Sequence, residues 1–341
     1  MKPTCVYLTI DTECTEERLI RGRIRPPLGY DLMMWGRFRN QSRPLGVELL
    51  LGELRAHRMA ATFFVEALCT EVFGRDGLAE VCAALLREGQ DIQLHLHPNL
   101  RRPEWRASGG KPLSDNIGEY TLDEQVKLLD DGFRYLVDAG VPRQSIVAFR
   151  AGCYGADNRT WDALRQVGLV LDSSLNVSYL HRECQIRWPT PEIDLFEVSP
   201  GTWELPITNF AERTGYRHLE ITAISYAEMA AALWGARRNQ VEHVTIIAHP
   251  AEFFVIDSAE RQLGRPNRIN IGRFRRLLAF LASHQDDFAV RTVGDLGRAL
   301  RSGEVTAPLE RPAIPRGSPV RRALRLAVQA VKRLDNRYGP A

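Results

Sequence analysis

Two histidines, His95 and His97, stand one residue apart at the end of the apolar run DIQLHL. Alternate side chains of an extended strand point to the same side, so both imidazoles would face one site. Two imidazoles at one site are suited to binding zinc, although histidine pairs also occur in polar loops without a metal. The pair alone therefore indicates a metal site without establishing one.

The acidic residues Asp11 and Glu13 show the same spacing after the apolar run VYLTI. Both carboxylates can point to one site, where one binds a metal and the other accepts a proton. A pair of solvated loop acids is the alternative interpretation. A carboxylate that joins two histidines and leaves one position open for water is typical of catalytic zinc.

The rest of the chain predicts the elements that position these residues. Short β-branched runs alternate with helical periods, which indicates a parallel α/β sheet, open or closed. Parallel strands end on one face, so Arg150, Asp172 and His249 at later strand ends can join the first four residues. An ion pair, a turn cap and a strand end are the structural alternatives for these three. The expected strands are residues 6–10, 61–66, 91–96, 145–150, 168–174 and 243–249, and the expected helices are residues 45–57, 76–88, 121–139, 157–167 and 225–239.

Composition narrows the class of protein. The 341 residues carry a net charge of +3, which is too small a surplus to indicate nucleic-acid binding. Six cysteines without a CxxC pair argue against a thiolate zinc site or a disulfide framework. No apolar run approaches the roughly 18 residues that span a bilayer, and no secretion signal is evident. We therefore expect a cytoplasmic protein that binds no nucleic acid.

Three segments interrupt or follow the α/β pattern. Residues 14–44 form a long loop with seven arginines and Trp35, and residues 98–118 form a second long loop. Residues 303–319 are rich in proline and predict an extended linker. Residues 320–341 predict a basic amphipathic helix, which either lies peripherally on the inner face of a membrane or packs on the main domain. The sequence leaves both alternatives open.

Five motifs along the chain, taken in order, resemble those of the polysaccharide deacetylases with the NodB homology domain, carbohydrate esterase family 4. The resemblance covers roughly residues 4–300, so residues 1–302 would form the deacetylase domain. It implies a distorted (β/α)7 barrel, to which this chain adds the C-terminal amphipathic helical tail. It also implies a divalent metal, Zn²⁺ first and Co²⁺, Ni²⁺ or Mn²⁺ as alternatives, and hydrolysis of an N-acetyl group on a sugar. The motifs are LTIDTE, QLHLHP, FRAGCYG, LDSSLN and IIAHP.

Each family role is carried over to the matching residue. The resemblance implies that Asp11 is the base, that Arg150 holds it ionised, and that His249 is the acid. Asp172 would orient and tune His249. Trp35, in the first long loop, is the aromatic residue assigned to the sugar, with a place in the core as its alternative. The implied metal ligands are Glu13, His95 and His97, and the implied oxyanion residues are Gly152 and Tyr154.

Three departures from the common family pattern define a divergent DxE/HxH branch. The two acids are two positions apart instead of adjacent, the histidines are closer together, and Gly152 replaces a proline. Such variants fit branches that act on precursors of lipopolysaccharide or exopolysaccharide. The spacing also allows Asp11 and Glu13 to exchange roles. The expected partner is an acetylated sugar, nucleotide-linked or lipid-linked, whose negative charge suits the basic first loop and C-terminal helix.

Other functions fit parts of the pattern. The segment DTECT resembles the first motif of haloacid-dehalogenase-type phosphatases, but Glu13 in its second acidic position and the unexplained histidine pair count against that class. Hydrolysis of another C–N bond, as in a cyclic amide or ureide, would fit the same fold. A catalytically degenerate barrel that only binds glycans is the non-enzymatic alternative. Metal content and acetate release distinguish these possibilities.

Overall fold

A parallel sheet forms the centre of the molecule. The computed structural model describes residues 2–16, 18–20, 23–101, 114–308 and 311–327. Its main sheet has the order β12-β1-β4-β5-β6-β7-β9-β8, and β15 also pairs with β1. Every pairing in this sheet is parallel except β8 with β9. The strands are β1 (Thr4–Thr12), β4 (Thr62–Glu66), β5 (Asp91–Leu96), β6 (Ala148–Ala151), β7 (Leu171–Asp172), β8 (Phe196–Ser199), β9 (Thr202–Glu204), β12 (His243–Ala248) and β15 (Phe288–Arg291).

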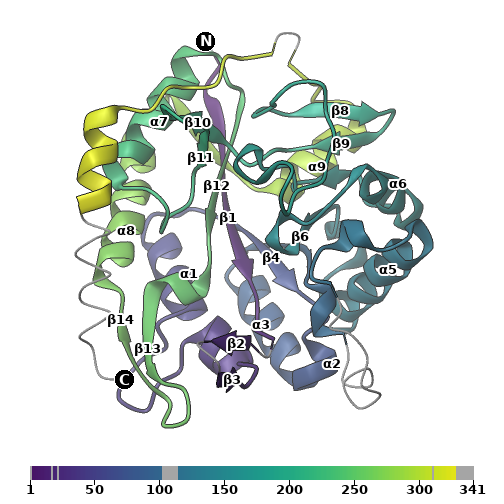
Figure 1. The fold of residues 1–341 in the computed structure, drawn as a ribbon, viewed down its shortest axis with the longest axis vertical. Helices are drawn as coiled ribbons and strands as arrows, with labels where there is room; N and C mark the ends of the chain where they lie inside the picture. Colours follow the sequence, from purple (N-terminus) through teal and green to yellow (C-terminus); the bar gives the residue numbers. More distant parts are fainter. Residues whose placement is uncertain (1, 17, 21–22, 102–113, 309–310, 328–341) are drawn as a thin grey trace.

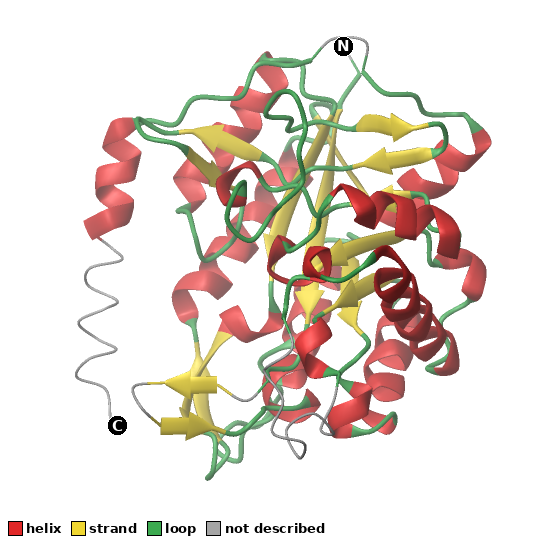
Figure 2. Cartoon of the chain, turned by 45° about the vertical axis from the view of Figure 1, so that its right-hand side comes forward, coloured by secondary structure: helices red, strands yellow, loops and turns green. Residues whose placement is uncertain are grey.

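Helices cover the outside of this curled sheet (Figures 1 and 2). Beyond β12 the segment around Glu220 makes a parallel bridge to Ile247, which continues the sheet past its last full strand. The architecture is the distorted α/β barrel that the sequence predicts. The helices are α1 (Val47–Ala56), α2 (Thr70–Phe73), α3 (Asp76–Arg87), α5 (Leu122–Asp138), α6 (Asn158–Val167), α7 (Tyr226–Arg238), α8 (Arg268–Ser283) and α9 (Val293–Ser302).

Three small hairpins lie outside the main sheet. Figure 1 shows two of them, β2–β3 and β13–β14, at the end of the molecule toward which β1 points. The candidate site lies at this same end, because it is built from residues that follow β1, β5, β6 and β12. The hairpins are β2 (Arg18–Ile20) with β3 (Arg23–Arg25), β10 (Asn209–Ala211) with β11 (Tyr216–His218), and β13 (Phe254–Ser258) with β14 (Leu263–Pro266).

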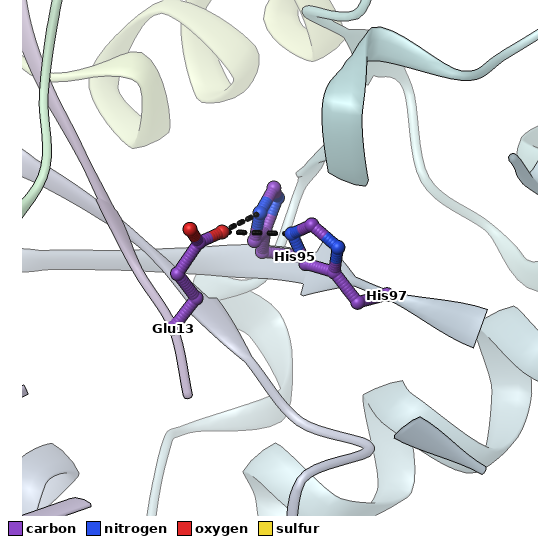
Figure 3. Close-up of side chains that lie close together, drawn as sticks. All are labelled: Glu13, His95 and His97. Atoms are coloured by element: carbon purple, nitrogen blue, oxygen red, sulfur yellow. Dashed lines mark hydrogen bonds and ion pairs between the residues drawn. The ribbon is translucent and has the colours of Figure 1, made fainter. Parts of the chain in front are cut away.

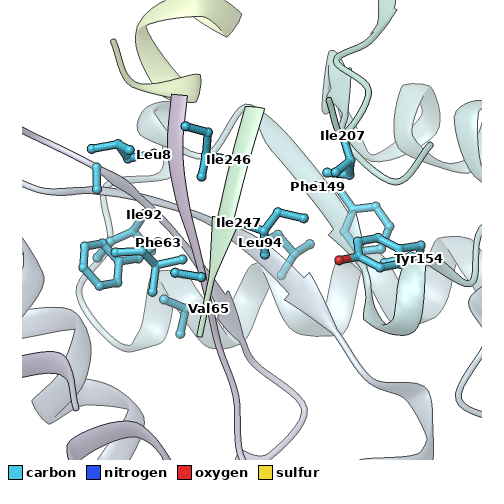
Figure 4. Packing of buried hydrophobic residues seen from close by; sticks show 14 of the residues in the cluster. Leu8, Phe63, Val65, Ile92, Leu94, Phe149, Tyr154, Ile207, Ile246 and Ile247 are labelled. Atoms are coloured by element: carbon cyan, nitrogen blue, oxygen red, sulfur yellow. The ribbon is translucent and has the colours of Figure 1, made fainter. Parts of the chain in front are cut away.

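Apolar side chains of the central strands hold the sheet in place (Figure 4). Leu8, Phe63, Leu94 and Phe149 are at most 2% exposed. Each such side chain stabilises the fold by about 1.5–3 kcal/mol relative to full exposure. All five residues of β4 are buried, as expected for a parallel strand covered on both faces. This packing fixes the strand ends that carry the polar residues.

The expected helices begin and end close to their predicted positions. Thr121 and Glu124 form a capping box at the start of α5, and Ser225 and Glu228 form another at the start of α7. Each box satisfies backbone N–H groups that a helix start would otherwise leave unpaired. The expected strand at residues 168–174 is shorter in the structure, where β7 covers only two residues. Helices α8 and α9, strand β15 and the β8–β9 pair were not among the expected elements.

The proline-rich segment that follows the barrel runs along its surface. The backbone of Ala211 accepts a hydrogen bond from Gly317 N–H at 2.8 Å and donates one to the Pro315 carbonyl at 2.7 Å. Residues 319–327 are helical, and this helix lies beside α7 (Figure 1). The remainder of the predicted tail, residues 328–341, lies outside the described residues.

Arg325 attaches this last helix to the barrel. Its guanidinium forms ion pairs with Glu212 at 2.6 Å and with Glu228 at 3.2 Å, and all three side chains are at most 5% exposed. Val320 and Leu324 of the same helix are 68% and 64% exposed. The helix therefore contacts the barrel through a buried arginine and leaves apolar side chains in solvent. No helix within the described residues is long and apolar enough to span a membrane.

Candidate active site

Glu13, His95 and His97 converge at one point, as Figure 3 shows. The Glu13 Oε2 atom lies 2.7 Å from His97 Nε2 and 3.3 Å from His95 Nε2. One ligand atom from each residue lies within 4.8 Å of the other two. The carboxylate and both imidazoles match the three protein ligands of a catalytic zinc site with one open position. The chain ends of β1 and β5 therefore bring Glu13 together with the predicted histidine pair.

The second nitrogen of each imidazole has an oxygen acceptor. His95 Nδ1 donates to the Arg150 carbonyl at 2.8 Å, and His97 Nδ1 donates to the Asp115 carboxylate at 2.9 Å. A proton held on Nδ1 leaves the Nε2 lone pair for a metal, which is the usual second-shell arrangement around metal-binding histidines. The ligand set and its hydrogen bonds thus fit a divalent cation.

The charges of Glu13 and His97 are coupled to each other. Burial opposes the charge on Glu13, but the nearby imidazoles outweigh it and hold the pKa of Glu13 well below its usual range. Burial also disfavours imidazolium at His97, but Asp115 and Glu13 together raise the pKa of His97 well above its usual range.

Asp115 is expected to support metal binding through His97. Asp115→Asn keeps an oxygen near Nδ1 but removes the charge, so metal affinity should fall roughly 10- to 100-fold. Competition with a chromophoric chelator measures this affinity. Asp130→Asn, an exposed position on α5, is the matched control and should bind metal like the wild type. Equal affinity in both variants would remove Asp115 from the site.

Asp11 lies between a buried arginine and His249. Its Oδ1 accepts a hydrogen bond of 2.5 Å from Arg150, and its Oδ2 lies 4.0 Å from His249 Nε2. Arg150 is fully buried and also donates to Thr9 and Ser173. Asp11 is therefore placed to receive a proton, and Arg150 takes the position expected from the sequence.

The loop after β6 approaches His97 closely. A Cβ atom on Gly152 would lie 2.6 Å from the His97 ring, so only glycine fits there without a shift. The next residues, Cys153 and Tyr154, have φ angles of 51° and 60°, which side-chain-bearing residues rarely adopt. Cys153 Sγ lies 3.3 Å from the Asp115 carboxylate. Strained backbone of this kind is typical of functional sites.

The carboxylate beside His249 differs from the one expected. Nδ1 of His249 lies 3.0 Å from Glu252 Oε1 and 3.9 Å from Glu220 Oε1. Asp172 instead accepts a hydrogen bond of 2.6 Å from Ser174. The expectation that Asp172 adjoins His249 is wrong, because side chains alternate along the chain here: Ser173 faces Arg150, and Asp172 faces the opposite side.

Asp172 belongs to a buried carboxyl pair with Glu204 on β9. The two residues are register partners, and Glu204 also accepts from Trp161 Nε1 at 3.0 Å and from Leu175 N–H at 2.9 Å. Burial raises the pKa of Asp172 to about 6. Burial and the charge of Asp172 raise the pKa of Glu204 well above its usual range. The pair therefore holds a proton at neutral pH.

This pair predicts a loss of stability as pH rises. Both pKa values are raised in the folded chain, so the stability from the protonated forms is complete below about pH 4. The contribution of Asp172 to stability is lost as the pH rises through its folded-state pKa of about 6. The contribution of Glu204 is lost at higher pH, because its pKa is raised further. Glu204→Gln cannot ionise, so its stability relative to wild type should increase with pH. Urea unfolding at pH 5, 7 and 9 measures the free energy of unfolding of both proteins. A difference in this free energy that stays constant with pH would contradict the prediction.

Trp35 is a core residue. It ends the short π-helix Asp31–Trp35, is 6% exposed and packs within the main hydrophobic cluster, with Arg37 over its ring at 4.6 Å. A ring buried to this extent is not available to stack on a sugar. The assignment of Trp35 to the substrate is wrong, since the first long loop folds back onto the core.

Sequence reasoning missed Asp115, Glu220 and Glu252. Glu252 carried a local signal, because it follows His249 by three residues in HPAE and can return to it within one tight turn. Asp115 belongs to the loop that follows the histidine pair, of which residues 102–113 lie outside the described residues. Glu220 carried no signal of its own, since it reaches the site through the bridge with β12.

The fold and the candidate site together define the structural class of the protein. It is an α/β barrel with a candidate metal centre at the carboxyl ends of its strands. No protein-family model and no curated protein sequence matches the chain. Among solved structures, it is similar to a protein from Mycobacterium smegmatis provisionally assigned as a polysaccharide deacetylase, with 18% identity and a TM-score of 0.52. That match covers 92% of this chain and 96% of the other. The chain thus has the NodB-like fold of the carbohydrate esterase family 4.

Two more distant structures are described as members of carbohydrate esterase family 4. PdaA of Bacillus subtilis is 10% identical over 89% of this chain and 82% of its own, with a TM-score of 0.39. BA3943 of Bacillus anthracis, a family pseudoenzyme, is 11% identical over 86% of this chain and 66% of its own, with a TM-score of 0.42.

Proposed function

We propose that this protein hydrolyses the N-acetyl group of a sugar in a glycan or glycan precursor, with a divalent cation held by Glu13, His95 and His97. The supporting observation is that these ligands and two groups suited to proton transfer, Asp11 and His249, meet at one end of the barrel. Zn²⁺ suits this ligand set best, and Co²⁺, Ni²⁺ or Mn²⁺ would fit as well.

A cation at this position supplies Lewis acidity, which polarises a carbonyl group and lowers the pKa of water. Asp11, which accepts a hydrogen bond from Arg150, receives the proton when water attacks the acetamide carbon. Backbone N–H groups of the loop around Tyr154 stabilise the tetrahedral oxyanion. His249, as imidazolium, then donates a proton to the departing amine, so that acetate and a free amino sugar are released.

His249, which lies next to Asp11, has the charge state that donating a proton to the amine requires. Burial disfavours imidazolium at His249, but Glu252, Glu13 and Asp11 outweigh it and raise the pKa of His249 well above its usual range. A protonated His249 beside the Asp11 carboxyl group is the arrangement that an acid and a base need to act in one reaction. Hydrolysis of a cyclic amide or ureide would use the same groups, and a glycan-binding barrel would need none of them.

The test is acetate release from N-acetylated glycan precursors, both nucleotide-linked and lipid-linked, by protein loaded with each of the four metals. Release that stops on chelation and returns on metal addition supports the proposal. Absence of bound metal together with absence of acetate would favour a glycan-binding barrel. Ring opening of ureides or release of ammonia, without release of acetate, would favour the hydrolase of a cyclic amide or ureide.

We also propose that the C-terminal helix contacts an anionic membrane surface. Val320 and Leu324 are exposed together on one face, and Arg321 beside them is exposed. Apolar and basic side chains in this arrangement are typical of interfacial helices. Flotation with anionic vesicles tests this: the double variant Val320→Glu, Leu324→Glu should float less than wild type, and equal flotation would overturn the idea. The cytoplasmic location stays a prediction.

A further inference from the structure

The chain around His249 forms a tight turn that returns to the histidine ring. Pro250 follows His249 and begins the turn Pro250–Phe253, in which Glu252 N–H donates to the His249 carbonyl at 3.0 Å. The Glu252 carboxylate thereby reaches His249 Nδ1 at 3.0 Å. The residues His249 and Glu252 are thus joined by one backbone hydrogen bond and one side-chain hydrogen bond.

The turn is fixed from a second direction. The Glu252 carbonyl accepts hydrogen bonds from Asn267 Nδ2 at 2.9 Å and Asn270 Nδ2 at 2.8 Å, at the start of α8. The Glu252 side chain is only 10% exposed. Its position is therefore set by the barrel and not by a flexible loop, which suits a residue that orients another.

The His249 ring lies between two carboxylates. Nδ1 faces Glu252, and Nε2 faces Asp11 Oδ2 at 4.0 Å. A proton shared between Nδ1 and Glu252 fixes the rotation of the ring and stabilises a second proton on Nε2, which is the atom nearest the reacting groups.

Other charged groups face the same ring. Glu220 approaches Nδ1 at 3.9 Å and is itself paired with His218 at 2.5 Å. Asp11 on β1 and Glu13 just after it add negative charge, and Arg150 on β6 offsets part of the charge of Asp11. Burial raises the pKa of Glu252, the hydrogen bond and charge of His249 oppose this shift, and Glu220 adds to it. Glu252 is the only group among these within hydrogen-bond distance of the His249 ring, which distinguishes it from the others.

We propose that Glu252 is the positioning residue for His249, holding its ring with Nε2 toward Asp11 and keeping it protonated until the amine departs. This inference rests on the proposed function for its role in the reaction. It transfers to Glu252 the role that the sequence resemblance implied for Asp172, whose carboxylate lies instead against Glu204.

The experiment compares Glu252→Gln with Glu260→Gln, an exposed position in the following hairpin, in the full metal-loaded chain. The first readout is NMR titration of the ¹⁵N-labelled His249 ring, which requires no substrate. In Glu252→Gln, His249 should lose its proton at least one pH unit lower than in wild type, and Glu260→Gln should titrate like wild type. Asp172→Asn should leave the titration of His249 unchanged.

The second readout is the pH profile of acetate release. In Glu252→Gln, kcat should fall by about 10²-fold, within the range that acid catalysis contributes, with KM nearly unchanged. The alkaline limb of kcat should move to lower pH. If Glu252 only stabilised the fold, Glu252→Gln would lower the amount of folded protein but leave the alkaline limb of the kcat profile at the same pH.

Three results would overturn the proposal. His249 could titrate identically in Glu252→Gln and wild type, or Asp172→Asn could shift it instead. Metal analysis could also show that wild type holds a second ion that Glu252→Gln loses, which would make Glu220, His249 and Glu252 a cation site. A wild type that titrates as expected but releases no acetate would refute the proposed function and leave the Glu252–His249 pairing standing.

Discussion

Asp11→Asn is expected to lower the rate of acetate release by about 10³-fold, the middle of the range that general base catalysis contributes. An amide cannot accept the proton from water, although its oxygen can still accept the hydrogen bond from Arg150. The variant should therefore keep its metal and lose its rate. Initial rates and metal content, measured on the same sample, check both parts of this expectation.

A buried charge complicates the experiment and calls for two controls. Asp11→Asn leaves Arg150 fully buried without a carboxylate, and breaking such a pair costs about 3–5 kcal/mol of stability. Circular dichroism at the assay temperature separates unfolding from lost catalysis. Asp31→Asn, which removes an exposed acid paired with Arg37, should retain the wild-type rate. A folded Asp11→Asn protein with more than a tenth of the wild-type rate would show that Asp11 is not the base.

His95→Ala is expected to abolish both metal binding and activity. The change leaves Glu13 and His97 as the protein ligands, too few for the three that catalytic zinc sites usually use. Metal content should fall from about one ion per chain to near zero after dialysis. Acetate release should fall with it, and elemental analysis by mass spectrometry measures the metal.

The matched control is His57→Ala, a half-buried histidine in the turn between α1 and β4 whose Nδ1 donates to the Glu53 carbonyl at 3.0 Å. It should bind metal and release acetate like wild type. Full metal occupancy in His95→Ala would refute the assignment of this histidine as a ligand. Loss of metal with full activity would refute a metal-dependent mechanism.

Much of the site followed from local geometry. A strand places residues two apart on the same side, so Asp11 with Glu13 and His95 with His97 could be paired from the sequence. Parallel strands end on one face, so the two pairs, Arg150 and His249 could be assigned to one end of the barrel. The structure brings these residues together there. Helix α8 also has apolar residues at helical spacing, although it was not among the expected helices.

The sequence by itself determined the α/β alternation, the strands that carry the site, and the two pairs that converge on a candidate metal position, because these depend on short-range periodicity. Only the tertiary structure decided which carboxylates support the histidines. Asp115 reaches His97 across a long loop, and Asp172 faces Glu204 because of the register between β7 and β9. The burial of Trp35 was likewise decided by the path of its loop. These contacts join residues that are far apart in the sequence, so the local periodicity of the sequence cannot pair them. Packing in the folded chain determines their partners.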